Sequence, residues 1–380
     1  MKSSSPNPAL RALPSSLHES ANLDFLRAVA VLLVFITHLY GIYTGKGAKW
    51  DFFWHIGQLG VLMFFVHSCL VLMWSLERSG LDGWRVFVPF YVRRAFRLYP
   101  LSVVCVLIAY CFDARWSPVN LWPNLTLTQN LFFTDKPVIP PTLTPLWSLP
   151  LEVQMYIVLP VLFLILRNRS LKLLALLWSS SIPVALLQPG WGERFEIFKY
   201  APCFLGGVVA WRLMRDTARL PGWLWPLAIV AASLTWMTAA PSYLPLHIAA
   251  CGICLGLAIP LFREIPWSHV RTASRITARY SYSIYLSHFP IMVYVFSDPR
   301  DPRFKLIRQL PPMKHLSRTA HFALFLLLSV LAPPALYHLV EKPGIRLGHK
   351  LARWISGSEE RKLAIETVTA ENQSPDAATL

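Results

Sequence analysis

Apolar residues along the 380-residue chain gather into runs about twenty residues long, separated by short polar or charged segments. An α-helix of that length crosses a hydrocarbon core of about 30 Å. The pattern therefore predicts an all-α, polytopic integral membrane protein with about ten transmembrane helices in contact with the lipid bilayer. The predicted spans are 23–44, 52–76, 96–113, 147–166, 171–188, 198–214, 222–240, 243–262, 280–297 and 319–340.

The charges in the loops predict the orientation of these spans. An even number of spans places both termini on the same side of the membrane. With a cytoplasmic amino terminus, the inner segments hold roughly twice as many Lys and Arg residues as the outer segments. Half of the outer positive charges lie in one loop, 298–318, which also carries Asp298 and Asp301. Both termini are therefore expected in the cytoplasm.

The pattern also predicts the domain organisation. Residues 1–22 are polar and rich in Ser and Pro, without the apolar core of a signal peptide, and are expected to form an amino-terminal tail. Residues 23–343 are predicted to form one membrane domain. The remaining segment, 344–380, is predicted to be a cytoplasmic, partly disordered tail, since its end carries few large apolar groups.

The composition supports a membrane protein, because 54% of the residues are hydrophobic and 15% are charged, against roughly 25% charged residues in soluble domains. A net charge of +16 can indicate a nucleic-acid partner. Here Lys and Arg lie between apolar runs, so no nucleic-acid partner is expected. Cys251 and Cys254 form a C-x-x-C inside an apolar run, where free Cys is commonly a packing residue, and neither a disulfide nor a metal is expected.

Ionisable residues within spans indicate a functional site, because charge in lipid is costly. Arg27 and His38 of the first span are about three helical turns apart, so they share one face and are separated by roughly 16 Å. Arg27 alone could be a snorkelling anchor. His38 lies deep in an apolar helix, and imidazole is the side chain best suited to proton transfer near neutral pH.

A cluster of three arginines, Arg93, Arg94 and Arg97, lies at the predicted cytoplasmic mouth of the third span. Arg94 and Arg97 share a helical face. Planar guanidinium groups bind phosphate through two parallel hydrogen bonds, so a phosphorylated donor could dock here. The alternative is binding of lipid headgroups together with orientation of the span.

A carboxylate follows where the outer loop enters the fourth span, in the sequence T-P-L-W-S-L-P-L-E-V-Q-M-Y. Glu152 lies about one turn inside the membrane. It could orient or deprotonate a hydroxyl, or pair with His38. The alternative is a purely structural hydrogen bond between helices. Trp147 and Tyr156 could be interfacial anchors.

The ninth span contains the sequence Y-S-Y-S-I-Y-L-S-H-F-P, which places His288 near its middle, after Ser283 and Tyr285. A packing or hydrogen-bonding role is favoured over catalysis for His288. The other histidines within or beside apolar runs have no partner at an informative spacing: His55, His67, His247, His321 and His338.

Together these segments resemble acyltransferase family 3 of membrane proteins over roughly 23–343. The resemblance rests on the order of four motifs: Arg27 and His38 with ten residues between them, Arg94-x-x-Arg97, Trp147-Ser148-Leu149 followed by Glu152, Gln154 and Tyr156, and Ser281-Tyr282-Ser283 with Tyr285 and His288. Two positions depart from the family pattern. His67 and Cys69 flank Ser68 where the family usually has a Ser-Gly pair, and Val153 stands where it commonly has a second Glu.

The resemblance implies a stand-alone enzyme, without an esterase-like domain, in the bacterial inner membrane. Such an enzyme would move an acyl group, with acetyl expected, from acyl-coenzyme A to a hydroxyl of a carbohydrate or glycolipid of the cell surface or for export. Acyl-coenzyme A would be a donor substrate rather than a permanently bound cofactor. The modification would be O-acetylation of an envelope polysaccharide or another exported glycan.

The same resemblance assigns roles to residues. Coenzyme A phosphates would bind Arg93, Arg94 and Arg97, with the pantetheine arm along Arg27. His38 would be the general base, positioned with the acceptor by Glu152. Supporting roles would fall to Trp147, Ser148, Gln154, Tyr156, Ser283, Tyr285 and His288.

Three alternatives stay open at this point. The acyl group could pass through an acyl-histidine intermediate instead of moving directly. A transporter or flippase for a lipid-linked glycan would also place polar residues in spans, and would act without acyl-coenzyme A. A lipid-binding scaffold would not need His38.

Overall fold

The apolar runs of the sequence fold as helices. The computed structural model describes residues 20–44, 52–112, 118–131, 139, 141–214, 219–237, 244–296 and 317–372. Within this part of the chain the structure is helical, with short 3-10 turns and a single isolated bridge between Leu220 and Phe262. The predicted all-α class is confirmed.

Each predicted span coincides with a helix. The long helices are α1 (Ala21–Thr44), α2 (Phe52–Arg78), α3 (Phe87–Phe112), α5 (Ser148–Leu166), α6 (Leu171–Leu187), α7 (Glu196–Leu213), α8 (Leu224–Met237), α9 (Leu244–Ala258), α10 (Ser268–Phe296) and α11 (Arg318–Leu336). Short elements include α4 (Pro118–Leu125), η4 (Gln129–Leu131) and η5 (Pro141–Trp147). The last helix, α12 (Lys342–Asn372), runs through residue 344, where the membrane domain is predicted to end.

Six of the described helical segments are long and apolar enough to cross a membrane: 21–42, 55–78, 83–111, 142–166, 171–191 and 319–357. Two shorter apolar helices cover 224–236 and 245–261. The structure thus supports an integral membrane protein. A count of ten crossings and cytoplasmic termini stay predictions, and residues 298–316 of the charged outer loop lie outside the described residues.

Two helices begin earlier than the apolar pattern predicts. Helix α3 starts at Phe87 rather than at 96, and α10 starts at Ser268 rather than at 280. Both extra segments carry arginines, which end an apolar run but are good helix formers. Charge marks where a span leaves lipid, not where its helix ends.

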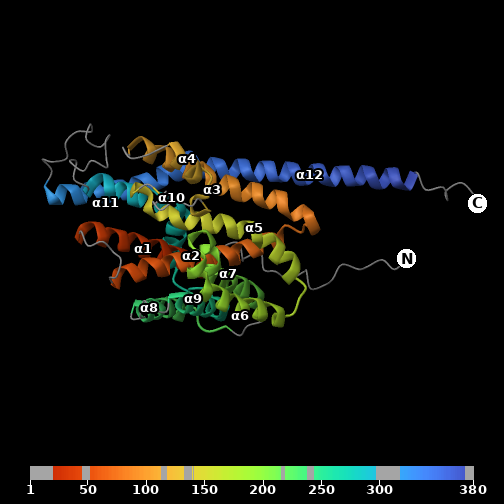
Figure 1. The fold of residues 1–380 in the computed structure, drawn as a ribbon, viewed down its shortest axis with the longest axis horizontal. Coiled ribbons are helices and arrows are strands. Elements are labelled where there is room, and N and C mark those ends of the chain that lie inside the picture. Colours follow the sequence, from red (N-terminus) through yellow and green to blue (C-terminus); the bar gives the residue numbers. More distant parts are fainter. Residues whose placement is uncertain are drawn as a thin grey trace, which may run out of the picture.

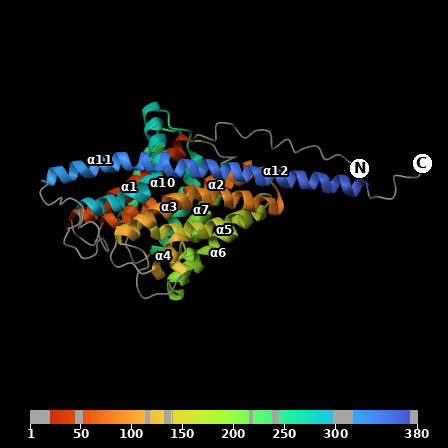
Figure 2. The same ribbon diagram turned by 90° about the horizontal axis from the view of Figure 1, so that it is seen from above.

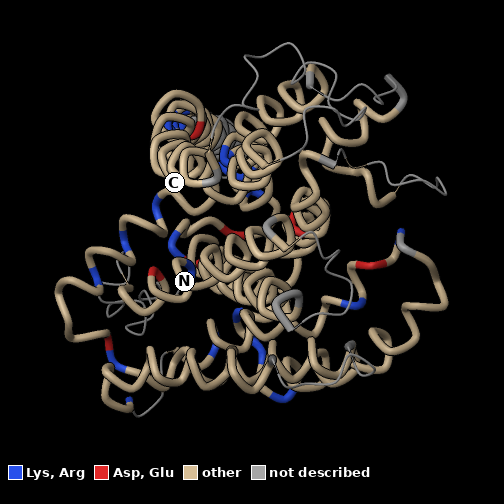
Figure 3. Tube along the Cα trace, turned by 90° about the vertical axis from the view of Figure 1, so that its left-hand side faces the viewer, with Lys and Arg blue, Asp and Glu red and all other residues tan. Residues whose placement is uncertain are grey.

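The helices lie side by side along the long axis of the molecule (Figure 1). Helices α1 and α2 lie between two groups: α3, α5 and α10–α12 on one side, and α6–α9 on the other. Accordingly α1 contacts α10 and α2, and α2 contacts α7, α8 and α9. Figure 3 views this bundle end-on, and most of its trace lies at uncharged positions.

Helices α7 and α9 approach each other closely through glycines. A Cβ atom on Gly206 of α7 would lie 2.1 Å from the carbonyl oxygen of Gly252 on α9, and one on Gly256 would lie 2.3 Å from the carbonyl oxygen of Gly206. Close backbone approach through small residues is a common way for helices to associate in lipid.

Helices α11 and α12 form one continuous rod, joined by a π turn at Tyr337–Glu341 (Figure 2). The first half of α12 packs on α3. Gly344 and Gly348 permit this contact, because a Cβ atom on either residue would lie 2.8 Å or less from atoms of Phe96. The rod places residues of the carboxyl-terminal region against the arginine-bearing segment of α3.

Candidate active site

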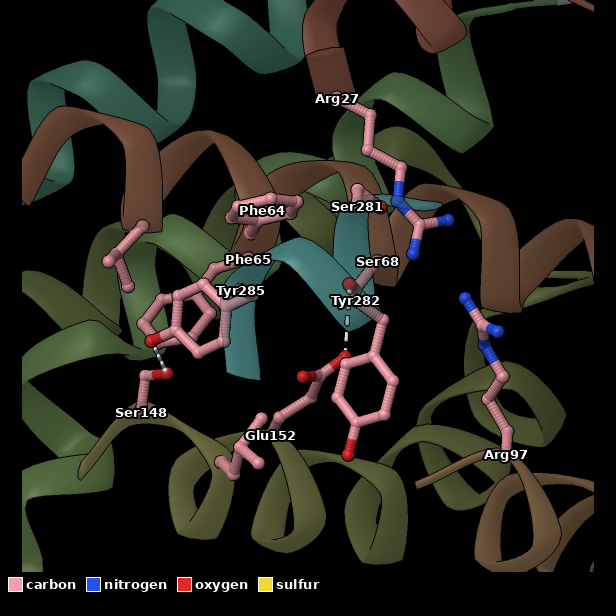
Figure 4. Close-up of a pocket in the computed structure, with 12 residues that line it drawn as sticks. Arg27, Phe64, Phe65, Ser68, Arg97, Ser148, Glu152, Ser281, Tyr282 and Tyr285 are labelled. Carbon is pink, nitrogen blue, oxygen red and sulfur yellow. Dashed lines mark hydrogen bonds between the residues drawn. The ribbon is translucent and has the colours of Figure 1, made fainter. Parts of the chain in front are cut away.

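A polar pocket of about 60 Å³ lies inside the helical bundle (Figure 4). Five helices line it. Its walls are Arg27 from α1, Val61, Phe64, Phe65 and Ser68 from α2, Arg97 from α3, Ser148, Leu149 and Glu152 from α5, and Ser281, Tyr282 and Tyr285 from α10. The structure therefore brings together members of all four sequence motifs, which are far apart in the chain.

The carboxylate of Glu152 is held by two hydroxyl donors. The Oγ of Ser68 donates to Oε1 at 3.1 Å, and the OH of Tyr156 donates to the same oxygen at 2.5 Å. Within the described residues, Oε2 receives no hydrogen bond and can accept one from a substrate. Glu152 is not paired with His38, so the pairing considered from the sequence is not formed.

Arginine side chains provide the positive charge of the site. Figure 4 shows the guanidinium groups of Arg27 and Arg97 turned toward one another across the pocket. Arg94 lies within electrostatic range of both, and of Glu152. The Nε atoms of Arg27 and Arg94 are buried and have no hydrogen-bond partner among the described residues. Because a buried unpaired donor is costly, these two atoms point to a ligand that accepts hydrogen bonds.

Arg97 differs from Arg27 and Arg94 because a carboxylate pairs with it. Its Nη1 atom forms an ion pair with Oε1 of Glu341, and its guanidinium lies 5.6 Å from the centroid of the Tyr282 ring. The Oγ of Ser283 donates to Oε2 of Glu341 at 2.6 Å. Glu341 was not among the site residues predicted from the sequence. The signal was present, since this carboxylate directly follows the last apolar run.

Ser148 and Tyr285 join the entrance of α5 to α10. The OH of Tyr285 donates to the carbonyl oxygen of Pro145 at 2.6 Å. Since that uses the single proton of Tyr285, the hydroxyl of Ser148 is the donor in the 2.6 Å contact between the two side chains. These bonds hold the wall from which Glu152 projects.

His38 lies outside the pocket wall and pairs with His288 of α10. The Nδ1 of His38 lies 2.9 Å from the carbonyl oxygen of Val34 and 3.2 Å from the Nε2 of His288. The Nδ1 of His288 lies 3.0 Å from the carbonyl oxygen of Ile284. His288 is buried, whereas His38 is partly exposed.

The carbonyl groups determine one consistent arrangement of protons. The Nδ1 of each imidazole faces a carbonyl oxygen, so each Nδ1 carries a proton. The Nε2 of His288 is then an acceptor, toward which the proton on the Nδ1 of His38 also points. The Nε2 of His38 keeps a free lone pair and has no partner among the described residues. This nitrogen is able to accept a proton from a substrate.

The other predicted site residues face elsewhere. The amide of Gln154 donates to Oδ1 of Asn130 at 3.0 Å, and Trp147 packs on Tyr200 with ring centroids 5.9 Å apart. Arg93 does not line the pocket. Among the described residues no group of three or more His, Cys, Asp or Glu could hold a metal ion.

Comparisons with known proteins give a family for this arrangement. A family model described as an acyltransferase domain matches residues 20–338. An "O-acetyl transferase" of Shigella phage Sf6 is 27% identical over 40% of this chain and 48% of its own length. "Acyltransferase MdmB" of Streptomyces mycarofaciens is 25% identical over 74% of this chain and 81% of its own length. No solved structure matches.

Proposed function

Since the chain belongs to acyltransferase family 3 and is a transferase, we propose that it moves an acyl group from acyl-coenzyme A to a carbohydrate hydroxyl. The observation that carries the proposal is the pair of buried Nε donors of Arg27 and Arg94, which lack partners within the described part of the chain and lie beside a pocket with a fixed carboxylate. An anionic acyl donor would supply the hydrogen-bond acceptors that these two Nε atoms lack. Acyl-coenzyme A would enter as a substrate and not as a permanently bound cofactor.

The donor would bind through its phosphates at the arginine cluster. Guanidinium groups match phosphate geometry and stay charged at any physiological pH. Arg27, Arg94 and Arg97 come from two helices and repel one another, so a bound phosphate lowers the electrostatic energy of all three. Arg93 would contact the donor only at the mouth of this site.

The thioester would then lie near His38. Arg27 and His38 share one face of α1 and are separated by roughly 16 Å, a span that the extended pantetheine arm can follow. The Nε2 of His38 takes the proton of the acceptor hydroxyl while the oxygen attacks the thioester carbonyl. The carbon–sulfur bond breaks, and the thiolate receives the proton from the imidazolium. Glu152 holds the acceptor or the donor through its free Oε2.

The relatives and the family support the choice of acceptor. The name of the phage relative, O-acetyl transferase, supports an acetyl group and an oxygen acceptor. A carbohydrate or glycolipid of the bacterial envelope, modified at the inner membrane, follows from the family resemblance. The transporter alternative receives no support from the family or its relatives. An acyl-histidine intermediate on His38 would use the same lone pair and is the second candidate route.

One experiment tests the proposal directly. Surface and exported glycans would be compared by mass spectrometry between cells with the gene, cells without it, and cells carrying His38→Ala. We expect one acetyl mass to be lost from a defined sugar in both mutant strains, and radiolabel from acetyl-coenzyme A to reach that sugar with purified protein. Identical glycans in all three strains, together with no transfer in vitro, would overturn the proposed acceptor class.

A further inference from the structure

The joint between α11 and α12 is a π turn, Tyr337–Glu341. Such turns insert an extra residue into a helix and occur frequently at functional sites. Here the insertion directs Glu341 into the bundle, where it is 1% exposed. A buried carboxylate is costly unless it is paired and hydrogen-bonded. The π turn therefore places the Glu341 carboxylate inside the bundle, where it needs a positively charged or hydrogen-bonding partner.

Both oxygens of Glu341 are used. Oε1 is paired with Nη1 of Arg97 on α3, and Oε2 accepts from Ser283 on α10. The carboxylate thus joins three helices that are distant in sequence. It does not line the polar pocket, whereas Arg97 does. Glu341 therefore contacts Arg97 without itself forming part of the pocket wall.

The ion pair uses only part of the Arg97 guanidinium. Nη1 is bonded to Glu341, while Nε and Nη2 have no hydrogen-bond partner among the described residues. The ring of Tyr282, 5.6 Å away, supports the guanidinium from a second side. A planar group fixed at one nitrogen and at one face has little freedom to turn, so its remaining donors keep one direction.

We infer that Glu341 is a positioning residue for the donor: it holds Arg97 so that the remaining guanidinium donors face the phosphate of acyl-coenzyme A. This inference rests on the proposed function, in which the arginine cluster binds the donor. Glu341 lies outside the four motifs that resemble those of the family. The π turn makes the α11–α12 rod part of the donor site.

The test measures the dissociation constant of coenzyme A and the melting temperature of the full chain, purified in lipid nanodiscs. Glu341→Gln keeps the size of the side chain and an acceptor for Ser283, but removes the negative charge that faces the guanidinium of Arg97. We expect it to raise the dissociation constant on the order of tenfold. Glu341→Asp keeps the charge on a shorter arm and should give an intermediate value.

A control carboxylate away from the pocket separates positioning from general stability. Glu264 accepts from the Oγ of Ser20 at 2.8 Å and from the backbone N–H of Asn22 at 3.0 Å, and it does not line the pocket. Glu264→Gln should lower the melting temperature without changing coenzyme A affinity. The double variant Arg97→Glu with Glu341→Arg should recover the melting temperature of the wild type, because the ion pair is restored in reverse. It should not recover the affinity for coenzyme A, because the pocket then lacks the guanidinium of residue 97.

Three outcomes would overturn the inference. An unchanged dissociation constant in Glu341→Gln would make the pair purely structural, and a lower one would mean that Glu341 competes with the donor for Arg97. If Glu341→Gln does not fold, wild-type affinity in Glu341→Asp together with recovered affinity in the charge exchange would also overturn it. Unchanged affinity in Arg97→Ala would instead reject the proposed donor site itself.

Discussion

The Nδ1 atom of His38 and the Nε2 atom of His288 lie 3.2 Å apart, although the residues are 250 positions apart in the chain. The carbonyl oxygen of Ile284 fixes the proton on the Nδ1 of His288, so the Nε2 of His288 accepts a hydrogen bond from the Nδ1 of His38. This contact orients His38 and leaves its Nε2 free. The packing or hydrogen-bonding role favoured for His288 from sequence thus has a mechanistic consequence.

His288→Ala should lower the rate of acyl transfer by on the order of tenfold or more, with little change in coenzyme A affinity, because the base remains but loses its orientation. Steady-state kinetics with purified protein would measure both quantities. His321→Ala is the control, since His321 also lies 3.1 Å from a backbone carbonyl oxygen four residues earlier but, among the described residues, forms no hydrogen bond with His38. Equal rates in His288→Ala and the wild type would contradict the assigned contact.

His38→Ala should abolish transfer while the protein still inserts and binds coenzyme A. A general base contributes on the order of 10²–10⁴ in rate, so its loss is visible even in a crude assay. His38→Gln should not restore activity, because an amide keeps a hydrogen bond but cannot accept the proton. Near-normal transfer by His38→Ala to a defined acceptor would move the role of base to Glu152 or His288.

Arg94→Ala and Arg97→Ala should both weaken coenzyme A binding but differ in stability. Among the described residues Arg94 forms no ion pair, and its buried Nε has no hydrogen-bond partner. Removing Arg97 leaves Glu341 buried without its counter-charge, at a cost of about 3–5 kcal/mol. Binding isotherms and thermal melts would separate the two effects. Unchanged donor affinity in both variants would reassign the cluster to lipid or to orientation.

Arg27→Lys should be an intermediate case in the same binding assay. The variant keeps the positive charge at the pocket wall but loses the planar fork. We expect coenzyme A affinity between those of the wild type and Arg27→Ala. Affinity equal to the wild type would mean that Arg27 acts as a point charge alone.

Reporter fusions test the predicted topology. Fusions at Asn130 and Lys305 should report the outer side, and fusions at Arg85 and Val270 the cytoplasm, because the positive-inside rule places the arginine-rich loops inward. Alkaline phosphatase and fluorescent-protein reporters would give opposite signals at each site. An inverted pattern would place the arginine cluster on the wrong side for a cytoplasmic donor.

Gly206→Ala should destabilise the membrane domain, because its Cβ atom would lie 2.1 Å from the backbone of Gly252. Overpacking of this kind typically costs about 1–3 kcal/mol. Gly190→Ala is the control, since no atom of the described residues lies within 4 Å of its added Cβ atom. Thermal melts that show no difference between the two variants would contradict the close approach of α7 and α9.

The sequence by itself determined the helical class and the approximate place of the apolar helices, because a bilayer demands apolar runs of defined length. It also indicated Arg27, His38, Arg97 and Glu152 as candidate site residues, since a charged or ionisable group within an apolar run stands out from its surroundings. These residues could be found without knowing how the helices pack.

Only the tertiary structure decided which of these groups meet. A membrane helix that is apolar on all sides does not show which face contacts which neighbour. The sequence therefore suggested Glu152 as a partner for His38, whereas the structure pairs Glu152 with Ser68 and Tyr156, and His38 with His288. Glu341 contacts Arg97, 244 positions away in the chain, because a π turn redirects its side chain. The π turn changes the register of the helix, and the spacing of apolar residues in the sequence does not reveal such a change.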